Sequence, residues 1–390
     1  MKLKADLSKK YGLVLEGGGA KGAYQIGAWK ALRENGIQIC AVAGTSVGAL
    51  NGALICMDDV AKAEHLWETI SYSKVMDVDD DLMESVYQGK LSPKEALIKG
   101  IRLFADGGAD ITPLKELIAK NIDEDSIRSG NVQFYVLTFS ITDRKELDLD
   151  LQQINKGELP EILLASAYLP VFKNQKLNGK MYMDGGMFNN VPLESLVKRN
   201  YKNIIMLRIY GLGREKKVEV PEDVTVHSIA PRVNLGRMLD FDSKKSKRNI
   251  LVGYYDAMRW LYGLSGTIYY LDEEESEESC LERLLTIKKA VKESALMLYK
   301  IPVKNQSVER AYLEHLLPLI AAELKLGKDW TYKSLYISMA EAAAKQLKVQ
   351  KYRIYTIQEL LDIIHEKLQV HAPEQGLPAF VYIIADKVET

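Results

Sequence analysis

The sequence predicts an α/β protein, in which a mainly parallel sheet is covered by helices on both faces and is followed by a mostly helical C-terminal region. Short apolar runs typical of strands alternate with segments of helical periodicity between residues 11 and 229, an alternation that favours a parallel sheet. After about Ser265 the alternation gives way to successive helical patterns. The chain has 390 residues, of which 47% are hydrophobic. This length and composition suit one large domain and a smaller one, with a sizeable core.

The first four elements are expected in the order strand, helix, strand, helix. Residues 11–16 are a short apolar run ending in glycines, and residues 23–34 repeat apolar side chains at helical spacing up to Gly36. Residues 37–43 favour a second strand and residues 47–57 a helix of small residues. Polar residues and glycines interrupt this second pair, so it is not expected to cross a membrane. Further strands are expected at residues 132–141, 181–183, 203–209 and 224–229.

Turn and cap signals support two later elements. Thr112 is expected to be the N-cap of a helix over residues 113–120, with Pro113 at its first position. Asn178-Gly179 predicts a hairpin turn immediately before the strand at residues 181–183.

The C-terminal part begins with an acidic run at residues 272–278, which is expected to be a solvated loop or linker. We therefore expect a first domain over residues 1–270 and a mostly helical region over residues 271–390, whose role the sequence leaves open. Within that region, helices are expected at residues 280–300, 307–326, 332–347 and 357–370, and a last strand at residues 380–385.

Charge and composition argue against several classes of protein. Lys and Arg total 52 against 53 for Asp and Glu, so the basic excess typical of nucleic-acid-binding proteins is missing. Three cysteines show no CxxC spacing and five histidines show no HExxH pair, so no metal and no cofactor are expected. The N-terminus lacks the apolar core of a signal peptide. We expect a cytoplasmic protein. The sequence leaves open whether it makes transient contact with a membrane surface, and it does not indicate the oligomeric state.

Ser46 lies in the strongest local motif, Gly44-Thr45-Ser46-Val47-Gly48, between a predicted strand and a predicted helix. A turn this sharp needs glycines beside the serine, and it would expose the hydroxyl at the carboxyl edge of the sheet. The adjacent helix N-terminus favours developing negative charge. The motif is short, and a structural glycine-rich turn with an incidental serine is the alternative.

A glycine-rich loop follows the first strand and precedes the first helix. Consecutive backbone N–H groups in such a loop can converge on an anion, as an oxyanion hole or a phosphate cradle. Its spacing also satisfies the dinucleotide pattern GxGxxG, but the next strand ends in Gly44-Thr45-Ser46 where an acidic residue should bind ribose. A phosphate-binding loop would need GK followed by Ser or Thr. The loop consists of Gly17, Gly18, Gly19, Ala20, Lys21 and Gly22.

Asp184 ends the predicted strand at residues 181–183 and is followed by Gly185 and Gly186. Asp-Gly-Gly often marks only a turn. Here it follows an apolar strand, so the carboxylate is expected at the sheet edge where sites gather in such folds.

These features together resemble the patatin-like phospholipase family. Four blocks occur in the family's order, over roughly residues 10 to 210: GGGAKG at 17–22, GTSVG at 44–48, ASAYLP at 165–170 and DGG at 184–186. The segment from Leu239 to Tyr254 also looks like bacterial members. The resemblance implies a three-layer α/β/α domain over residues 1–270 that cleaves carboxylic esters of phospholipids or related lipids. It does not cover the C-terminal region.

The resemblance also implies roles for individual residues. Ser46 would be the nucleophile and Asp184 the base of a dyad without histidine, and the N–H groups around Gly18, Gly19 and Ala20 would form the oxyanion hole. Gly44 and Gly48 would shape the nucleophile elbow, while Gly185 and Gly186 would be structural. Lys21 would be a solvated residue, or else would orient the loop or meet lipid head groups.

The dyad poses a chemical difficulty, because an aspartate with a pKa of about 3.9 is a poor base for a serine hydroxyl. Burial of Asp184 would raise that pKa.

Two alternatives to an enzyme of this kind are a catalytically silent lipid-binding scaffold and a nucleotide-binding enzyme. The basic residues Lys244, Lys245, Lys247 and Arg248 are expected on a solvated helix face, with contact to anionic lipid as the alternative.

Overall fold

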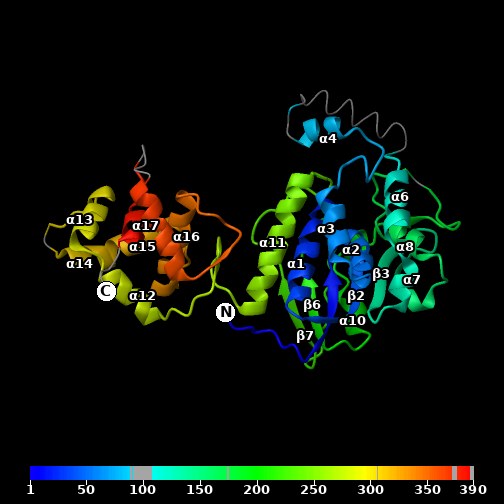
Figure 1. Ribbon diagram of the computed structural model, residues 1–390, viewed down its shortest axis with the longest axis horizontal. Helices are drawn as coiled ribbons and strands as arrows, with labels where there is room; N and C mark the ends of the chain where they lie inside the picture. The colour runs from blue at the N-terminus through cyan, green and yellow to red at the C-terminus, as the bar shows by residue number, and fades with distance from the viewer. Residues whose placement is uncertain (88–89, 91–107, 174, 305, 371–375, 387–390) are drawn as a thin grey trace. The chain divides into compact units, whose positions relative to one another are not determined.

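The computed structural model describes residues 1–87, 90, 108–173, 175–304, 306–370 and 376–386. The chain divides into two compact units, one of residues 4–261 and one of residues 262–390 together with residues 1–3 (Figure 1). None of the helices in the described stretches is long and apolar enough to cross a membrane.

The first unit is built on a seven-stranded sheet in the order β4-β3-β2-β1-β6-β7, with β5 paired to β3. β3 is antiparallel to β4 and β5, and the other neighbouring strands are parallel. The predicted mainly parallel sheet is therefore confirmed. The strands are β1 Lys10–Leu15, β2 Gln38–Thr45, β3 Gln133–Ser140, β4 Lys145–Asp150, β5 Tyr182–Met183, β6 Asn203–Leu207 and β7 Thr225–Ile229.

One strand of this sheet, β4, was not expected from the sequence. Its residues, KELDLD, include only two apolar side chains, and the strand remains partly exposed at the sheet edge. An apolar run therefore does not mark it, and its identity as a strand depends on pairing with β3.

The register of the two central strands brings two motifs together. Leu15 of β1 pairs with Gly44 of β2, so both strands end at the same level. The glycine-rich loop that follows β1 therefore begins beside Ser46.

Helices cover both faces of the sheet. On one face, Gly52 of α2 lies against the side chains of Val42 and Phe134. On the other face, Leu196 of α10 joins a buried cluster with Val14 of β1. The predicted three-layer α/β/α arrangement is confirmed. The helices of this unit are α1 Ala23–Glu34, α2 Val47–Cys56, α3 Val60–Glu68, α4 Asp80–Tyr87, α6 Thr112–Asn121, α7 Glu124–Ser129, α8 Leu159–Ser166, α9 Gly186–Asn189, α10 Leu193–Val197 and α11 Ser243–Tyr262, with 3-10 turns at Gly19–Gly22 and Leu151–Gln153.

The helices α1 and α11 approach each other backbone to backbone. A Cβ on Gly27 would lie 1.9 Å from the carbonyl oxygen of Ile250, and one on Gly253 would lie 1.9 Å from that of Tyr24. Glycine is required at both positions because no side chain fits between the helices.

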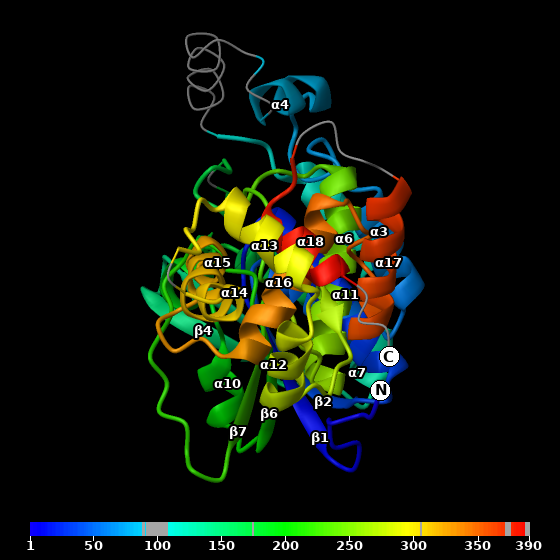
Figure 2. The ribbon, with the colours of Figure 1, turned by 90° about the vertical axis from the view of Figure 1, so that its left-hand side faces the viewer.

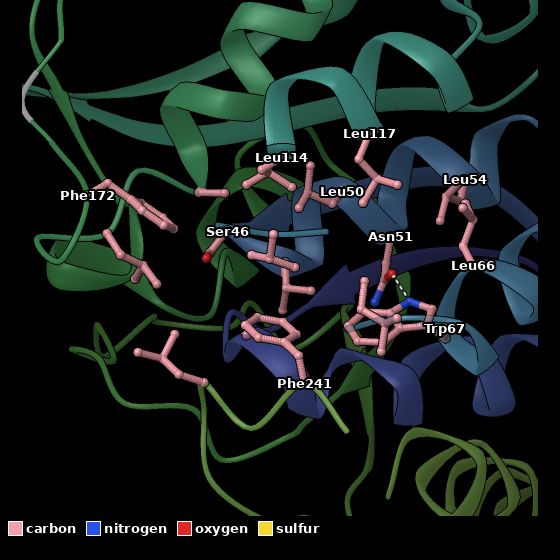
Figure 3. A pocket seen from close by; sticks show the side chains of 17 residues that line it. Ser46, Leu50, Asn51, Leu54, Leu66, Trp67, Leu114, Leu117, Phe172 and Phe241 are labelled. Atoms are coloured by element: carbon pink, nitrogen blue, oxygen red, sulfur yellow. Dashed lines mark hydrogen bonds between the residues drawn. The ribbon is translucent and has the colours of Figure 1, made fainter. Parts of the chain in front are cut away.

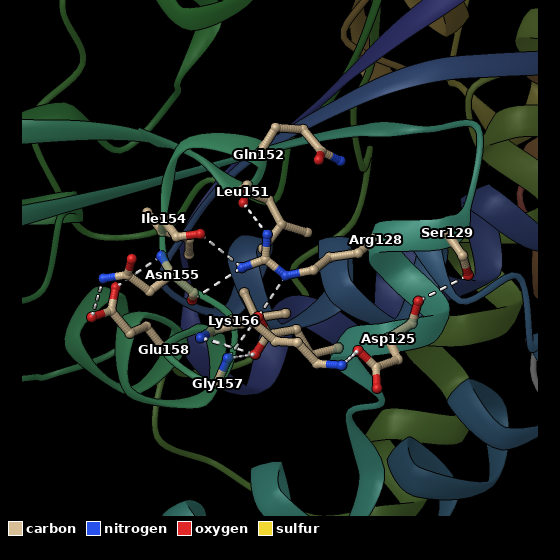
Figure 4. A network of polar contacts seen from close by, with 12 residues as sticks. Asp125, Arg128, Ser129, Leu151, Gln152, Ile154, Asn155, Lys156, Gly157 and Glu158 are labelled. Atoms are coloured by element: carbon tan, nitrogen blue, oxygen red, sulfur yellow. Dashed lines mark hydrogen bonds and ion pairs between the residues drawn. The ribbon is translucent and has the colours of Figure 1, made fainter.

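An ion pair between Arg128 and Glu124, both mostly buried, holds the loop that precedes α8. Arg128 bonds Glu124 at 2.7 Å and donates to the carbonyl oxygens of Leu151 and Ile154 at 2.7 and 3.0 Å (Figure 4). Glu124 in turn accepts from the backbone N–H of Gly157 at 3.1 Å. The network holds the segment before α8, the helix whose last residue is Ser166.

The second unit is mostly helical. Its central helix α16 packs against α12, α17 and α18 (Figure 2). The elements are α12 Glu277–Leu285, α13 Lys289–Leu298, α14 Val308–Ala311, a π-helical turn at Tyr312–Leu316, α15 Leu317–Glu323, α16 Tyr332–Gln346, α17 Ile357–Val370 and α18 Ala379–Ala385, with a small parallel pair β8 Tyr270–Leu271 and β9 Ile354–Tyr355.

Glu341 of α16 is a buried anchor for the first residues of this unit. Its carboxylate accepts backbone N–H groups from Thr267, Ile268 and Tyr269 at 2.7–2.9 Å. The carboxylate is only 1% exposed, so these bonds replace the water it would otherwise need.

Three sequence expectations need correction. Residues 380–385 are not a strand but part of helix α18. The run is buried on nearly every side, so it has no alternation or helical stripe by which its type could be recognised. Residues 280–300 form two helices instead of one, because the chain breaks at residues 286–288, where the N–H of Lys288 donates to Asp386. The N-cap of α6 is Ile111, and Thr112 is already helical.

The acidic run is also only partly a loop. Its last residues, Glu277 and Glu278, form the first turn of α12 behind the N-cap Ser276. Acidic side chains favour this position because of the partial positive charge of a helix N-terminus.

Candidate active site

Ser46 occupies a strained turn between β2 and α2. Its φ of 56° and ψ of −127° lie where non-glycine residues are uncommon. A Cβ on Gly44 would lie 2.3 Å from the carbonyl oxygen of Gly48, and a Cβ on Gly48 would lie 2.3 Å from that of Leu15. Both glycines are therefore needed for the turn that holds Ser46 at the end of the sheet.

Asp184 accepts a hydrogen bond directly from the Ser46 hydroxyl, with 2.5 Å between Oγ and Oδ2. The other carboxylate oxygen accepts the N–H of Gly186 at 2.7 Å. Both side chains are buried, Ser46 being 6% and Asp184 3% exposed. Burial raises the pKa of the Asp184 carboxyl to about 6, against the lowering effect of the two hydrogen bonds.

The two glycines after Asp184 are required by close approaches. A Cβ on Gly185 would lie 2.7 Å from the carbonyl oxygen of Leu137, and one on Gly186 would lie 2.5 Å from the side-chain oxygen of Asn190. A side chain at position 185 would force a backbone shift next to Asp184, and one at position 186 would require the buried side chain of Asn190 to move.

The glycine-rich loop lies against Ser46. A Cβ built on Gly17 would be 3.2 Å from the Cβ of Ser46, and Gly19 lines the same cavity as Ser46. Within the described residues, the N–H groups of Gly18 and Gly19 meet no acceptor, whereas that of Ala20 donates to the carbonyl oxygen of Met238 at 2.7 Å. Two of the three N–H groups expected at an oxyanion hole are thus available for a ligand.

Lys21 ties this loop to the segment after β6. Its ammonium donates to the carbonyl oxygen of Tyr210 at 2.6 Å. Burial lowers the pKa of Lys21, while the charge of Glu16 acts in the opposite direction. The contact agrees with the loop-orienting interpretation of this lysine, one of the alternatives that the sequence leaves open.

Glu16 is a residue that sequence reasoning missed as part of the site. Its buried carboxylate accepts the backbone N–H groups of Ile209 and Tyr210 at 2.7 and 3.1 Å and pairs with Arg208 at 2.9 Å. These bonds hold Gly211 so close to the loop that a Cβ there would lie 1.8 Å from the carbonyl oxygen of Gly17. A charged residue closing an apolar strand was the signal that could have identified it.

Ser166 is a second missed residue, although its sequence block was noticed. Its hydroxyl accepts the backbone N–H of Ser46 at 2.9 Å and donates to the carbonyl oxygen of Leu137 at 2.5 Å. The backbone carbonyl of Ser166 accepts the N–H of Gly185 at 3.3 Å. Two residues later, the carbonyl of Tyr168 accepts the N–H of Asp184 at 2.8 Å. The block therefore links the backbones of the serine and the aspartate.

A cavity of about 100 Å³ opens beside Ser46 and is lined almost entirely by apolar side chains (Figure 3). The exception, Asn51, donates to the carbonyl oxygen of Gly22 at 2.9 Å and accepts from the indole of Trp67 at 2.9 Å, so its polar atoms are satisfied by protein. Such a lining suits a hydrocarbon chain. The walls include Val47, Leu50 and Leu54 of α2, Leu66 and Trp67 of α3, Leu114 and Leu117 of α6, Phe172 and Phe241.

No group of His, Cys, Asp or Glu side chains suited to a metal ion occurs in the part of the chain that the structure describes. The serine and the aspartate contact each other with no histidine between them. Fold and site together define an α/β/α protein with a buried serine–aspartate pair at a strand-to-helix turn.

Residues 13–197, just under half of the chain, match the family model Patatin-like phospholipase. This confirms the resemblance indicated by the four sequence blocks. A relative from Invertebrate iridescent virus 6, "Probable lipid hydrolase 463L", is 26% identical over 49% of this chain and 65% of its own length. "Neuropathy target esterase sws" of Drosophila melanogaster is 28% identical over 51% of this chain and 13% of its own length. The chain thus covers less than two thirds of each relative.

Among solved structures, VipD from Legionella pneumophila aligns with 96% of this chain and 90% of its own, at 14% identity and a TM-score of 0.40.

Proposed function

We propose that this protein is a lipid acyl hydrolase that cleaves carboxylic esters of phospholipids or related lipids, with Ser46 as nucleophile and Asp184 as base. The observation that carries the proposal is the direct Ser46–Asp184 hydrogen bond of 2.5 Å, made by a serine that lines an apolar cavity. The match of residues 13–197 to the patatin-like phospholipase family supports it, as do two relatives named as a lipid hydrolase and an esterase.

In the first half of the reaction, Asp184 Oδ2 takes the proton of Ser46 Oγ while that oxygen attacks the ester carbonyl carbon. The carbonyl oxygen becomes an oxyanion, and the N–H groups of Gly18 and Gly19 stabilise it by about 3–4 kcal/mol for each donor that is well placed. Collapse of the intermediate breaks the ester bond. Asp184 then returns the proton to the leaving alcohol, and the acyl group stays on Ser46.

In the second half, water replaces the alcohol beside Asp184. The carboxylate removes a proton from that water as it attacks the acyl-serine carbonyl, and the same N–H groups hold the second oxyanion. The bond to Ser46 Oγ breaks, the fatty acid leaves, and the proton held by Asp184 restores the serine hydroxyl.

The raised pKa of Asp184 addresses the weakness of an ordinary aspartate as a base. A carboxyl with a pKa of about 6 is still mostly ionised at neutral pH, yet it binds a proton more readily than an exposed aspartate. The apolar cavity would hold the acyl chain, since it begins at Ser46 and continues along α2 to Leu54.

Labelling with a fluorophosphonate, which traps activated serines covalently, tests the assignment. Labelling of the wild type and its loss in Ser46→Ala and Asp184→Asn are expected. Ser195→Ala is a matched control, because Ser195 is also a buried serine bonded to an aspartate, Asp148, at 2.8 Å. An unlabelled wild type would favour the silent lipid-binding scaffold, and a label that persists in Ser46→Ala would contradict the nucleophile.

A further inference from the structure

The segment after β6 carries exposed apolar side chains beside the candidate active site. We define the rim loop as residues 210–214, with the sequence YGLGR. Leu212 is 76% exposed and Tyr210 57% exposed. Exposed leucine and tyrosine side chains are common one at a time, so their meaning depends on where the loop lies.

The rim loop is fixed at both ends against the site. At one end, Gly211 contacts the backbone of Gly17, as described above. At the other end, a Cβ on Gly213 would lie 2.4 Å from the carbonyl oxygen of Gly186, which also accepts the N–H of Arg214 at 2.9 Å. Leu212 therefore lies between the glycine-rich loop and the residues that follow Asp184.

A third exposed apolar side chain comes from the same place. Met187 directly follows Gly186 and is 50% exposed. Because Gly186 is the contact point of the rim loop, Met187 and Leu212 emerge from neighbouring backbone. Apolar side chains gathered on backbone next to the Ser46–Asp184 pair mark an interaction surface more strongly than scattered ones.

Charged residues follow Leu212 in the chain, and the acidic one among residues 214–217, Glu215, is paired with Arg208. Arg214 and Lys217 have no ion-pair or side-chain hydrogen-bond partner within the described residues. In contrast, the cluster after residue 243 is partly used in the fold, since Lys245 pairs with Asp240 and Arg248 donates to the carbonyl oxygen of Asn234. Free cations next to exposed apolar side chains suit a lipid surface, where phosphates lie just outside the acyl region.

We propose that the rim loop and Met187 form the surface by which this protein docks on a phospholipid bilayer, with Leu212 and Met187 inserted and Arg214 and Lys217 at the phosphates. The inference rests on the proposed lipid hydrolysis, because docking there would present an acyl chain next to Ser46. Lys21 is not part of this surface, as its ammonium is bonded to the rim loop itself.

Vesicle hydrolysis compared with hydrolysis of a soluble ester tests the surface. With equimolar phosphatidylcholine and phosphatidylglycerol vesicles, Leu212→Asn and Met187→Gln should each lower the hydrolysis rate about tenfold, the size expected for removing one apolar side chain from a lipid phase. Turnover of p-nitrophenyl butyrate should stay within about twofold of wild type. Leu251→Asn on α11, where Leu251 is 45% exposed, is the matched control and should change neither rate.

Direct vesicle binding separates a failure of docking from a failure of the proposed function. Co-sedimentation is measured in the Ser46→Ala background, so it does not depend on hydrolysis. Leu212→Asn should weaken vesicle binding about tenfold. The double variant Arg214→Gln with Lys217→Gln should lose most of the extra binding that vesicles containing phosphatidylglycerol show over vesicles of pure phosphatidylcholine. Equal binding by Ser46→Ala with and without Leu212→Asn, or an equal loss of both hydrolysis rates, would overturn the inference.

Discussion

The backbone N–H of Ser46 is bonded to the side chain of Ser166, 120 residues further along the chain. This bond holds the backbone amide of Ser46, whose φ is positive. The Ser166 hydroxyl in turn donates to the carbonyl oxygen of Leu137 on the neighbouring strand β3. The strained turn thus has support from outside its own motif, which makes Ser166 a positioning residue for the proposed nucleophile.

Ser166→Ala is expected to slow fluorophosphonate labelling of Ser46 by about 10- to 100-fold, because small displacements of a reacting group have large effects on rate. It should also lower the free energy of unfolding by about 1–3 kcal/mol, since a buried N–H loses its acceptor. Ser140→Ala is the control, as Ser140 is equally buried on β3 but bonded to Asp143. If both variants label at the same rate, Ser166 has only a structural role.

The rate of labelling should depend on pH through Asp184. The carboxyl must be ionised to accept the serine proton, so the rate should rise with pH and level off above an apparent pKa of about 6. Labelling reactions quenched at successive times, at values from about pH 4.5 to 8, would give the labelling rate as a function of pH. A midpoint near the ordinary aspartate value would mean that Asp184 is solvated in solution.

Asp184→Asn should inactivate the protein yet stabilise it at neutral pH. The folded-state pKa of Asp184 is raised from 3.8 to about 6, so ionisation of the carboxyl opposes folding as pH rises, and the full effect is present above about pH 6. Removing the charge should therefore increase the free energy of unfolding by roughly 2–3 kcal/mol at pH 7.5 and by little at pH 4. Denaturant titrations of both proteins at these two pH values provide the check. If Asp184→Asn raised the free energy of unfolding equally at both pH values, the loss of the buried charge would not be the cause.

Gly19→Ala is expected to abolish labelling, because a Cβ there would lie 2.2 Å from the carbonyl oxygen of Met238 and the residue has a φ of 56°. Gly36→Ala separates the two causes, since Gly36 also has a positive φ of 79° but its Cβ would meet nothing closer than 3.9 Å. The control should lose about 1 kcal/mol of stability without losing labelling. Full labelling of Gly19→Ala would show that the loop can move away from Met238 without harm.

Sequence reasoning identified the parts of the site that belong to short local motifs. Ser46 and Asp184 each stand at the end of a predicted strand beside glycines, and such turns can be recognised without knowing their neighbours. Glu16 and Ser166 act through partners far along the chain, at Ile209 and Ser46 respectively. No local pattern specifies those pairings. The helix α18 was mistaken for a strand for a related reason, because its type is set by the helices around it.

The anchoring of residues 267–269 by Glu341 has a practical consequence for expressing the second unit alone. A fragment that starts at residue 271 would lack all three N–H donors and leave a buried carboxylate without partners, which costs several kcal/mol or forces local unfolding. A fragment of residues 262–390 retains them. We expect the longer fragment to resist limited proteolysis and the shorter one to be degraded or insoluble, so the nine residues 262–270 decide whether this unit can be studied in isolation.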